Sequence, residues 1–283
     1  LGVVGESGCG KSTLARAIIG LVEASEGEIL WLGKNLRKQS AKQWKDTRKD
    51  IQMIFQDPLA SLNPRMNIGE IIAEPLKIYQ PHLSAAEVKE KVQAMMLKVG
   101  LLPNLINRYP HEFSGGQRQR IGIARAIVLG PKLVVCDEPV SALDVSVQAQ
   151  VLNLLMDLQK EMGMAYIFIS HDLSVIKHIS DRIMVMYLGH VVELADKDDL
   201  YKRTMHPYTT ALLSAIPVPD RKHKKEKIVL EGDLPSPANP PSGCVFHTRC
   251  YKAQEICKTQ VPELRDCGNG HCCACHFPEN QPE

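Results

Sequence analysis

Short apolar runs rich in β-branched residues alternate along this chain with stretches in which apolar residues recur at helical spacing. This alternation is typical of an α/β layer fold, in which helices cover a largely parallel sheet. Helices are expected over residues 12–21 and 119–129. Strands are expected over residues 28–32, 51–55, 132–136, 165–170 and 182–187, the last turning into a hairpin with 190–194.

The first four residues, Leu1 to Val4, read as a buried strand that runs straight into a glycine-rich turn. A buried strand needs neighbours, and no strand precedes this one. We therefore expect N-terminal strands of a longer protein to be missing from this chain. Without them, Leu1–Val4 is predicted to keep an unpaired apolar edge, which invites aggregation.

Strand patterns are interrupted between about residues 57 and 129, where only helical patterns occur. Ser84 and Glu87 have the spacing of a capping box, and the apolar stripe behind them ends at Gly100. This segment is predicted to be a helical subdomain inserted into the α/β fold.

Composition excludes several classes of protein. The 283 residues carry 34 Lys and Arg against 32 Asp and Glu, and only 5% are aromatic. A nucleic-acid platform would need a basic excess and stacking rings. There is no apolar run long enough for a membrane span and no signal-peptide pattern at the start. If the protein works at a membrane, it is therefore expected to do so through partners.

A glycine-rich segment after the first strand matches the phosphate-loop pattern G-x-x-x-x-G-K-S/T without a mismatch. Glycines let backbone N–H groups curl around phosphate oxygens, and the helix that follows adds partial positive charge. Lys11 is expected to reach the β- and γ-phosphates, and the Ser12 hydroxyl to ligate Mg²⁺. The predicted nucleotide-binding residues here are Gly5, Glu6, Ser7, Gly8, Cys9, Gly10, Lys11, Ser12 and Thr13.

Two acidic residues follow the buried strand that is predicted at 132–136. Asp137 is expected at the carboxyl end of this strand, where open α/β sheets bind their ligands, and would hold Mg²⁺. Glu138, one residue later, is placed to polarise a water that attacks the γ-phosphate. Gln56 and His171 each follow another strand, where an amide can meet Mg²⁺ or water and an imidazole can contact the γ-phosphate.

A second glycine-rich helix start has its own anion-binding potential. It is formed by Ser114, Gly115, Gly116 and Gln117. The order of all these elements over residues 1–205 resembles the nucleotide-binding subunits of ABC-type ATPases. The Ser141–Asp144 loop is part of the same resemblance, whereas Phe113 stands where that family usually has leucine.

This resemblance implies a RecA-like P-loop NTPase fold that binds ATP and Mg²⁺, with Ser12, Gln56 and Asp137 near the metal. It assigns catalytic roles to Glu138, His171 and Gln56. It also implies a head-to-tail pair of subunits, in which the Ser114–Gln117 signature of one subunit completes the ATP site of the other. Asp144 is expected among the nucleotide-binding residues. An adenine-stacking aromatic residue would lie upstream of the phosphate loop. GTP is disfavoured because no Asn-Lys-x-Asp motif occurs.

Seven of the nine cysteines fall between Cys244 and Cys275. Because seven is odd, complete disulfide pairing would leave one thiol over. If the chain is cytosolic, its thiols stay reduced, and ligation of a metal or cluster is then the better interpretation. Four thiolates can hold either a zinc ion or an iron–sulfur cluster. The spacing of Cys244, Cys250 and Cys257 is too wide for a zinc knuckle, whereas residues 272–275 could supply a tighter pair.

Residues 206–283 resemble the carboxyl extension of oligopeptide and dipeptide ABC importers, on the basis of His206–Thr209, 235–243 and the cysteine spacing. Residues 57–65 are similar to the same subfamily. A charged stretch at 221–227 is interpreted as a solvated linker within this extension. The resemblance implies a 4Fe-4S cluster, with zinc or no metal as alternatives. Its ligands would be Cys244, Cys250, Cys257 and Cys275.

The chain most resembles the F-type ATP-binding subunit of these importers. That resemblance implies a D-type homologue as the second ATPase and two membrane-spanning permease subunits. A peptide-binding protein would supply the peptide, and the subunit would lie at the cytoplasmic face of the inner (plasma) membrane. The alternatives are a soluble ABC ATPase that is not coupled to transport, and a metal- or redox-sensing ATPase.

Overall fold

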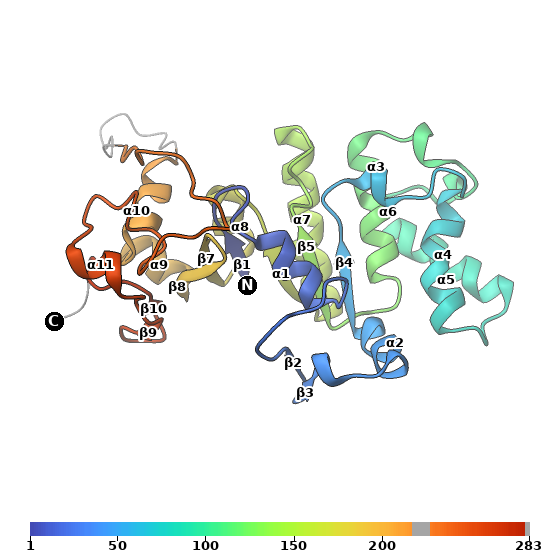
Figure 1. Cartoon of the computed structure of the whole chain (residues 1–283). Coiled ribbons are helices and arrows are strands. Elements are labelled where there is room, and N and C mark those ends of the chain that lie inside the picture. The colour runs from blue at the N-terminus through green and yellow to red at the C-terminus, as the bar shows by residue number, and fades with distance from the viewer. Residues whose placement is uncertain (217–226, 281–283) are drawn as a thin grey trace. The chain divides into compact units, whose positions relative to one another are not determined.

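The computed structural model of the chain describes residues 1–216 and 227–280, which form two compact units (Figure 1). Unit 1 combines Leu1–Ser12 with the chain from Phe168 onward, and unit 2 comprises Thr13–Ile167. The expected linker at 221–227 lies almost entirely outside the described residues.

Unit 1 is built on a sheet in which the strand that precedes the phosphate loop is central. The strand order is β6-β1-β7-β8-β10-β9, with β1 parallel to β6 and β7 and the later pairs antiparallel. The strands are β1 (Gly2–Val4), β6 (Ala165–Ile169), which begins in unit 2, β7 (Arg182–Tyr187), β8 (His190–Asp196), β9 (Arg265–Asp266) and β10 (Cys272–Cys273). The helices are α8 (Leu173–Ile179), α9 (Lys197–Lys202), α10 (Pro207–Ser214) and α11 (Glu255–Thr259).

The expected unpaired edge on the first strand is wrong. Gly2 pairs with Phe168 of β6 on one side and with Ile183 of β7 on the other. Both partners come from much later in the chain, because neighbours in a parallel sheet are joined by long crossovers. Val3 is fully buried between them. The apolar pattern of Leu1–Val4 therefore indicates a central strand whose partners lie downstream.

Unit 2 contains the parallel pair β4 (Ile51–Ile54) and β5 (Leu133–Asp137). The strand expected at 28–32 is shorter, since only β2 (Leu30–Trp31) pairs, with β3 (Lys34–Asn35). The α-helices are α1 (Lys11–Ile18), which begins in unit 1, and α2 (Ala41–Asp50), α3 (Pro58–Ser61), α4 (Ile68–Tyr79), α5 (Ala85–Lys98), α6 (Gly115–Ile127) and α7 (Val145–Met162).

Residues 57–129, all of them described, hold helices and no strand, in agreement with the predicted helical segment. The capping box of Ser84 and Glu87 begins α5, and an equivalent box of Asn67 and Glu70 begins α4. The apolar faces of α4 and α5 are buried together with that of α6. These three faces form the core of the segment, as the helical periodicity requires.

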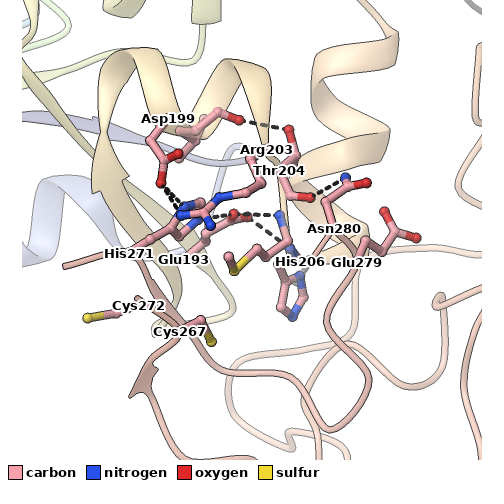
Figure 2. A network of polar contacts seen from close by, with 12 residues as sticks. Glu193, Asp199, Arg203, Thr204, His206, Cys267, His271, Cys272, Glu279 and Asn280 are labelled. Carbon is pink, nitrogen blue, oxygen red and sulfur yellow. Dashed lines mark hydrogen bonds and ion pairs between the residues drawn. The ribbon is translucent and has the colours of Figure 1, made fainter. Parts of the chain in front are cut away.

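The cysteine-rich extension is part of unit 1, because β10 pairs with β8 and continues its sheet. A buried polar network ties the same segment to α9 (Figure 2). His271 Nε2 lies 2.7 Å from Glu193 Oε1 of β8, and His271 Nδ1 lies 2.7 Å from Asp199 Oδ2 of α9. The extension and β8 thus share one sheet within unit 1.

No helix in the described parts of the chain, 1–216 and 227–280, is long and apolar enough to cross a membrane.

Candidate nucleotide-binding site

The phosphate loop leaves β1 in unit 1 and ends in the first turn of α1. The Lys11 side chain is buried inside the loop, where its Nζ donates to the carbonyl oxygens of Gly5 (2.7 Å) and Glu6 (3.0 Å). Nζ also lies 3.8 Å from the Cys9 thiol, which is itself buried. The Lys11 ammonium group is therefore held against the backbone of its own loop. Phosphate oxygens of a bound nucleotide would replace these two carbonyl oxygens as its partners.

Two glycines of the loop are required by their surroundings. A Cβ on Gly5 would lie 2.1 Å from the Met186 carbonyl oxygen of β7, so no larger residue fits there. Gly10 has a φ of +100°, which side-chain-bearing residues rarely adopt. The hairpin turn after β7 closes against the loop, since Gly189 N donates to the Cys9 carbonyl at 2.9 Å. The motif is thus fixed by packing as well as by sequence.

His171 belongs to the same unit as the phosphate loop. It follows β6, the parallel neighbour of β1, and Ser170 N donates to the Val3 carbonyl at 3.1 Å. The carboxyl ends of parallel strands meet at one edge of a sheet, so His171 and the loop follow neighbouring strands at that edge. The side chain is exposed. The γ-phosphate contact of His171 stays a prediction.

Unit 2 brings the predicted acids and Gln56 together. β4 and β5 run parallel with Ile54 opposite Cys136, so that Gln56 and Glu138 follow equivalent positions. Gln56 Nε2 donates to Glu138 Oε2 at 3.2 Å. Glu138 has a φ of +43°, a left-handed conformation that is unusual for a residue with a side chain and is found at functional sites. Asp137, one residue earlier, is buried at the end of β5.

The Ser114 signature forms the N-terminus of α6 in unit 2. Ser114 Oγ accepts from Gln117 N (3.3 Å), and Gln117 Oε1 accepts from Ser114 N (3.0 Å). A Cβ on Gly115 would lie 3.6 Å from Leu143, which places the signature beside the Ser141–Asp144 loop. The first helical turn thus presents its N–H groups next to that loop, an arrangement suited to an anion.

Asp144 acts as a helix cap in this structure. Its Oδ1 accepts from Val147 N at 3.0 Å, and this hydrogen bond, with a second from Ser146, lowers the pKa of the Asp144 carboxyl. Ser141 Oγ donates to the Glu138 carbonyl at 3.0 Å. The loop is therefore fixed at both ends, to α7 and to the residue predicted to polarise water.

Sequence reasoning missed two residues that contact the phosphate loop from the extension. Tyr208 of α10 accepts the Glu6 N–H at 2.9 Å, and Arg249 donates to both Glu6 carboxylate oxygens. They lie 202 and 243 residues from Glu6 in the sequence, and no local motif couples positions so far apart.

The four tail cysteines that were predicted as ligands line one cavity together with aromatic and imidazole side chains. Burial raises the pKa of Cys250 and of Cys275 to about 11, and neighbouring thiols, among them Cys244 and Cys257, add to the rise. The four predicted ligands therefore share one cavity lining. The cavity is about 10 Å³, which holds no more than one water and not an iron–sulfur cluster.

Within residues 1–216 and 227–280, no group of three or more His, Cys, Asp or Glu side chains could hold a metal ion. The predicted cluster and the zinc alternative thus gain no support from ligand geometry. The extra thiols Cys267 and Cys273 are buried against Met205, and Cys275 packs against this group.

Two family models match the chain. The ABC transporter family matches residues 1–141, and the C-terminal region of oligopeptide/dipeptide transporters matches residues 192–257. The first match contains the phosphate loop, Gln56, the Ser114 signature and both acids. The second begins in β8 and ends within the cysteine-rich extension. Both halves of the predicted resemblance are thereby confirmed.

Curated relatives agree with both matches. The chain is 77% identical to the oligopeptide transport ATP-binding protein OppF of Haemophilus influenzae, over 97% of this chain and 83% of the relative. It is 56% identical to the oligopeptide transport ATP-binding protein AppF of Bacillus subtilis, over 98% and 85%.

Solved structures share the fold. The cbiO1 subunit of an ABC transporter complex from Clostridium perfringens has a TM-score of 0.64 at 28% identity, over 71% of this chain and 78% of that one. A dimeric ATP-binding cassette bound to ADP and Pi has a TM-score of 0.63 at 28% identity, over 69% and 84%. On the strength of the two family matches and the curated relatives, the chain is a member of the ABC transporter ATPases that include the oligopeptide transport ATP-binding proteins.

Proposed function

We propose that this chain is the ATP-hydrolysing subunit that energises the import of oligopeptides through an ABC transporter. The observation that carries the proposal is the combination of a complete phosphate loop with an extension of the oligopeptide-transporter type in one chain. Relatives named as oligopeptide transport ATP-binding proteins align with nearly the whole chain. No observation favours a soluble ATPase or a metal-sensing ATPase.

Each residue of the site has a distinct chemical task. Lys11 and the loop N–H groups bind the phosphates, and Lys11 exchanges the carbonyls of Gly5 and Glu6 for phosphate oxygens. Glu138 orients and polarises the attacking water, while His171 contacts the γ-phosphate. Gln56 holds the Glu138 carboxylate through its amide N–H, so that a change at Gln56 reaches the catalytic carboxylate directly.

Each unit carries oxygen donors of the kind that Mg²⁺ prefers. Asp137 is a buried carboxylate at a strand end, and Gln56 follows the neighbouring strand. Ser12 carries its hydroxyl in the first turn of α1. Hard cations prefer such oxygen ligands. When bound, Mg²⁺ neutralises charge that develops on the β- and γ-phosphate oxygens.

The subunit acts in a head-to-tail pair with a D-type homologue. Ser114, Gly115, Gly116, Gln117 and Asp144 then complete the ATP site of the partner. The N-terminus of α6 supports this role, because its N–H groups and the Ser141–Asp144 loop lie together in unit 2. The dimeric relative bound to ADP and Pi provides a fold-level precedent.

Membrane-spanning permease subunits dock on unit 2 and place this chain at the cytoplasmic face of the plasma membrane, where a peptide-binding protein delivers the peptide. A groove of about 690 Å³ supports the docking, since it runs from Gln56 along Phe55 to Tyr79 of α4. Phe55 is exposed there, which suits an apolar partner. A partner in this groove would touch Gln56 and thereby Glu138.

The tail is proposed to bind a 4Fe-4S cluster through Cys244, Cys250, Cys257 and Cys275. The cysteine spacing of the importer-type extension is what supports this assignment, and the cavity lined by the four thiols would have to widen to admit the cluster. Anaerobically purified full-length protein should contain about four irons and four sulfides per chain, and Cys→Ser changes at any of the four should lower that content. Cys267→Ser should keep it. Colourless protein with one tightly bound zinc would contradict the assignment.

Reconstitution tests the main proposal. The full-length protein is assembled with its membrane partners in vesicles, and ATP hydrolysis and peptide uptake are measured with and without the peptide-loaded binding protein. Peptide should stimulate both activities, and Glu138→Gln should slow both by about 10²–10⁴-fold while ATP still binds. If the rate of ATP hydrolysis did not change with peptide and no peptide were taken up, coupling to import would be refuted.

A further inference from the structure

Glu6 of the phosphate loop is held within unit 1 at its backbone N–H, its carbonyl and its carboxylate. Its N–H donates to the Tyr208 hydroxyl at 2.9 Å, and its carbonyl accepts from Lys11 Nζ at 3.0 Å. Its carboxylate accepts two hydrogen bonds from Arg249, at 2.7 and 3.3 Å. Two of these three partners come from the extension, so the extension fixes the first turn of the loop.

The Arg249 contact is a strong and specific one. A bidentate arginine–carboxylate pair has defined geometry and is stronger than a neutral hydrogen bond. The Arg249 side chain is only 9% exposed and that of Glu6 29%, so solvent screens the pair less than it screens a surface ion pair. Breaking the pair would leave a poorly solvated carboxylate inside the loop.

Rigid packing presents Arg249 to the loop. Arg249 lies in the turn between Cys244 and Cys250, and its N–H donates to the Phe246 carbonyl at 3.0 Å. The Phe246 ring is buried against Tyr187 at the end of β7 (5.1 Å between centroids) and against Tyr208 (5.3 Å). Both extension residues that hold Glu6 are thus built on one aromatic cluster.

Charge gives this contact a functional consequence. The phosphates of a nucleotide are strongly negative, and an uncompensated carboxylate in the loop that receives them would repel them. Arg249 neutralises Glu6 and holds its carboxylate in place, while Tyr208 fixes its backbone. A loop that is set in advance also loses less conformational freedom when a ligand binds.

We propose that Arg249 and Tyr208 are positioning residues for nucleotide binding, through which the cysteine-rich extension sets the affinity of the phosphate loop for ATP by way of Glu6. This inference rests on the proposed function, because it assumes that the loop binds ATP. It assigns the extension a task in the ATPase cycle, beyond that of an appended module.

A double-mutant cycle separates this role from simple anchoring of the extension. The dissociation constant of ATP is measured on full-length protein with Mg²⁺, by displacement of a fluorescent ATP analogue. Arg249→Gln should weaken binding about tenfold, which corresponds to about 1.4 kcal/mol. In a Glu6→Gln background the same change should weaken binding less than about twofold, because no carboxylate remains to be neutralised. Arg249→Lys should restore part of the affinity.

Matched controls and a second variant complete the test. Lys258→Gln removes an exposed cation of the same extension, whose partner is Glu255, and should leave the affinity unchanged. Tyr208→Phe keeps the aromatic packing, removes the hydroxyl that accepts the Glu6 N–H, and should weaken binding about threefold. If Arg249→Gln does not fold, the ATP affinity of Tyr208→Phe tests whether the extension acts on the phosphate loop through Glu6.

Several results would overturn the inference. One is an Arg249→Gln protein that is folded by circular dichroism and binds ATP like the unaltered protein. Another is an equal loss with and without the Glu6→Gln change, which would mean that Arg249 acts elsewhere. Unaltered protein that fails to bind ATP would instead refute the proposed function, and this inference with it.

Discussion

Replacing His271 with glutamine should destabilise the extension in a manner that depends on pH. The imidazole is buried between Glu193 of β8 and Asp199 of α9, with both ring nitrogens at 2.7 Å from carboxylate oxygens (Figure 2). Burial disfavours the charged ring, but the two carboxylates outweigh it and raise the pKa of His271 above its ordinary value. A glutamine side chain at this position would fill similar space without the positive charge.

The direction of the pH dependence follows from this raised pKa. A histidine whose pKa is higher in the folded state stabilises the protein fully below its unfolded pKa of about 6.5. That contribution is lost as pH rises through the folded value. The pKa of Asp199 is held low, mainly by its hydrogen bond from Arg203 and to a smaller extent by His271. The contribution of ionised Asp199 to stability is therefore lost only in acid and does not change near neutral pH. The penalty of His271→Gln should therefore be largest near pH 6 and should shrink toward pH 9.

The magnitude can be bounded from the contacts. Removing one partner of a buried ion pair costs about 3–5 kcal/mol. Glu193 keeps two backbone donors, Met205 N (2.7 Å) and His206 N (3.0 Å), and the Asp199 side chain is 32% exposed. We therefore expect a loss near the lower limit, about 3 kcal/mol at pH 6, and a smaller loss at pH 9, because deprotonation removes the attraction between the imidazolium and the two carboxylates.

Urea unfolding of the full-length protein, followed by circular dichroism at both pH values, measures this difference. His190→Gln is the matched control, because His190 is exposed on the same strand, β8, and its replacement should change stability little at either pH. A penalty that is equal at the two pH values, or larger at pH 9, would refute the assignment of a charged imidazole between two carboxylates.

Three further predictions concern the nucleotide site. Glu138→Gln should slow ATP hydrolysis by about 10²–10⁴-fold with binding intact, and near-normal turnover would contradict its role as the group that polarises water. Lys11→Ala should instead weaken ATP binding, measured by displacement of a fluorescent analogue, because the loop loses its only side-chain cation. Gly116→Ala should destabilise unit 2 by about 1–3 kcal/mol in thermal denaturation, since a Cβ would lie 2.4 Å from Val147 Cγ1, whereas Gly115→Ala should be tolerated structurally. Equal melting temperatures for the two alanine variants would show that α6 and α7 adjust freely.

Most of the nucleotide site could be predicted from the sequence because its motifs are short and lie at strand ends. The glycine-rich loop after Leu1–Val4 and the acids after the run at 133–136 have the expected local structures. Gln56 and Glu138 are 82 residues apart, yet they meet because each follows a strand of the same parallel pair. The order of strand ends thus accounts for the contact between Gln56 and Glu138.

Pairing between distant segments could not be predicted in the same way. The sequence suggested an unpaired edge at Leu1–Val4, but β6 and β7 cover both sides of β1. It also placed the cysteine-rich extension after a boundary, whereas Cys272 pairs with Leu194 in β8. Two-residue strands such as β10 have no periodicity of their own, so only the sheet to which they are added defines them.

The sequence by itself determined the class of fold, the phosphate loop, the paired acids and the signature, because each depends on residues within about ten positions of one another. The tertiary structure alone decided that Arg249 and Tyr208 hold Glu6, and that His271 bridges Glu193 and Asp199. Those contacts join residues 72 to 243 positions apart. Their partners are selected by how the chain packs, since a buried charge is tolerated only where folding brings it a counter-charge.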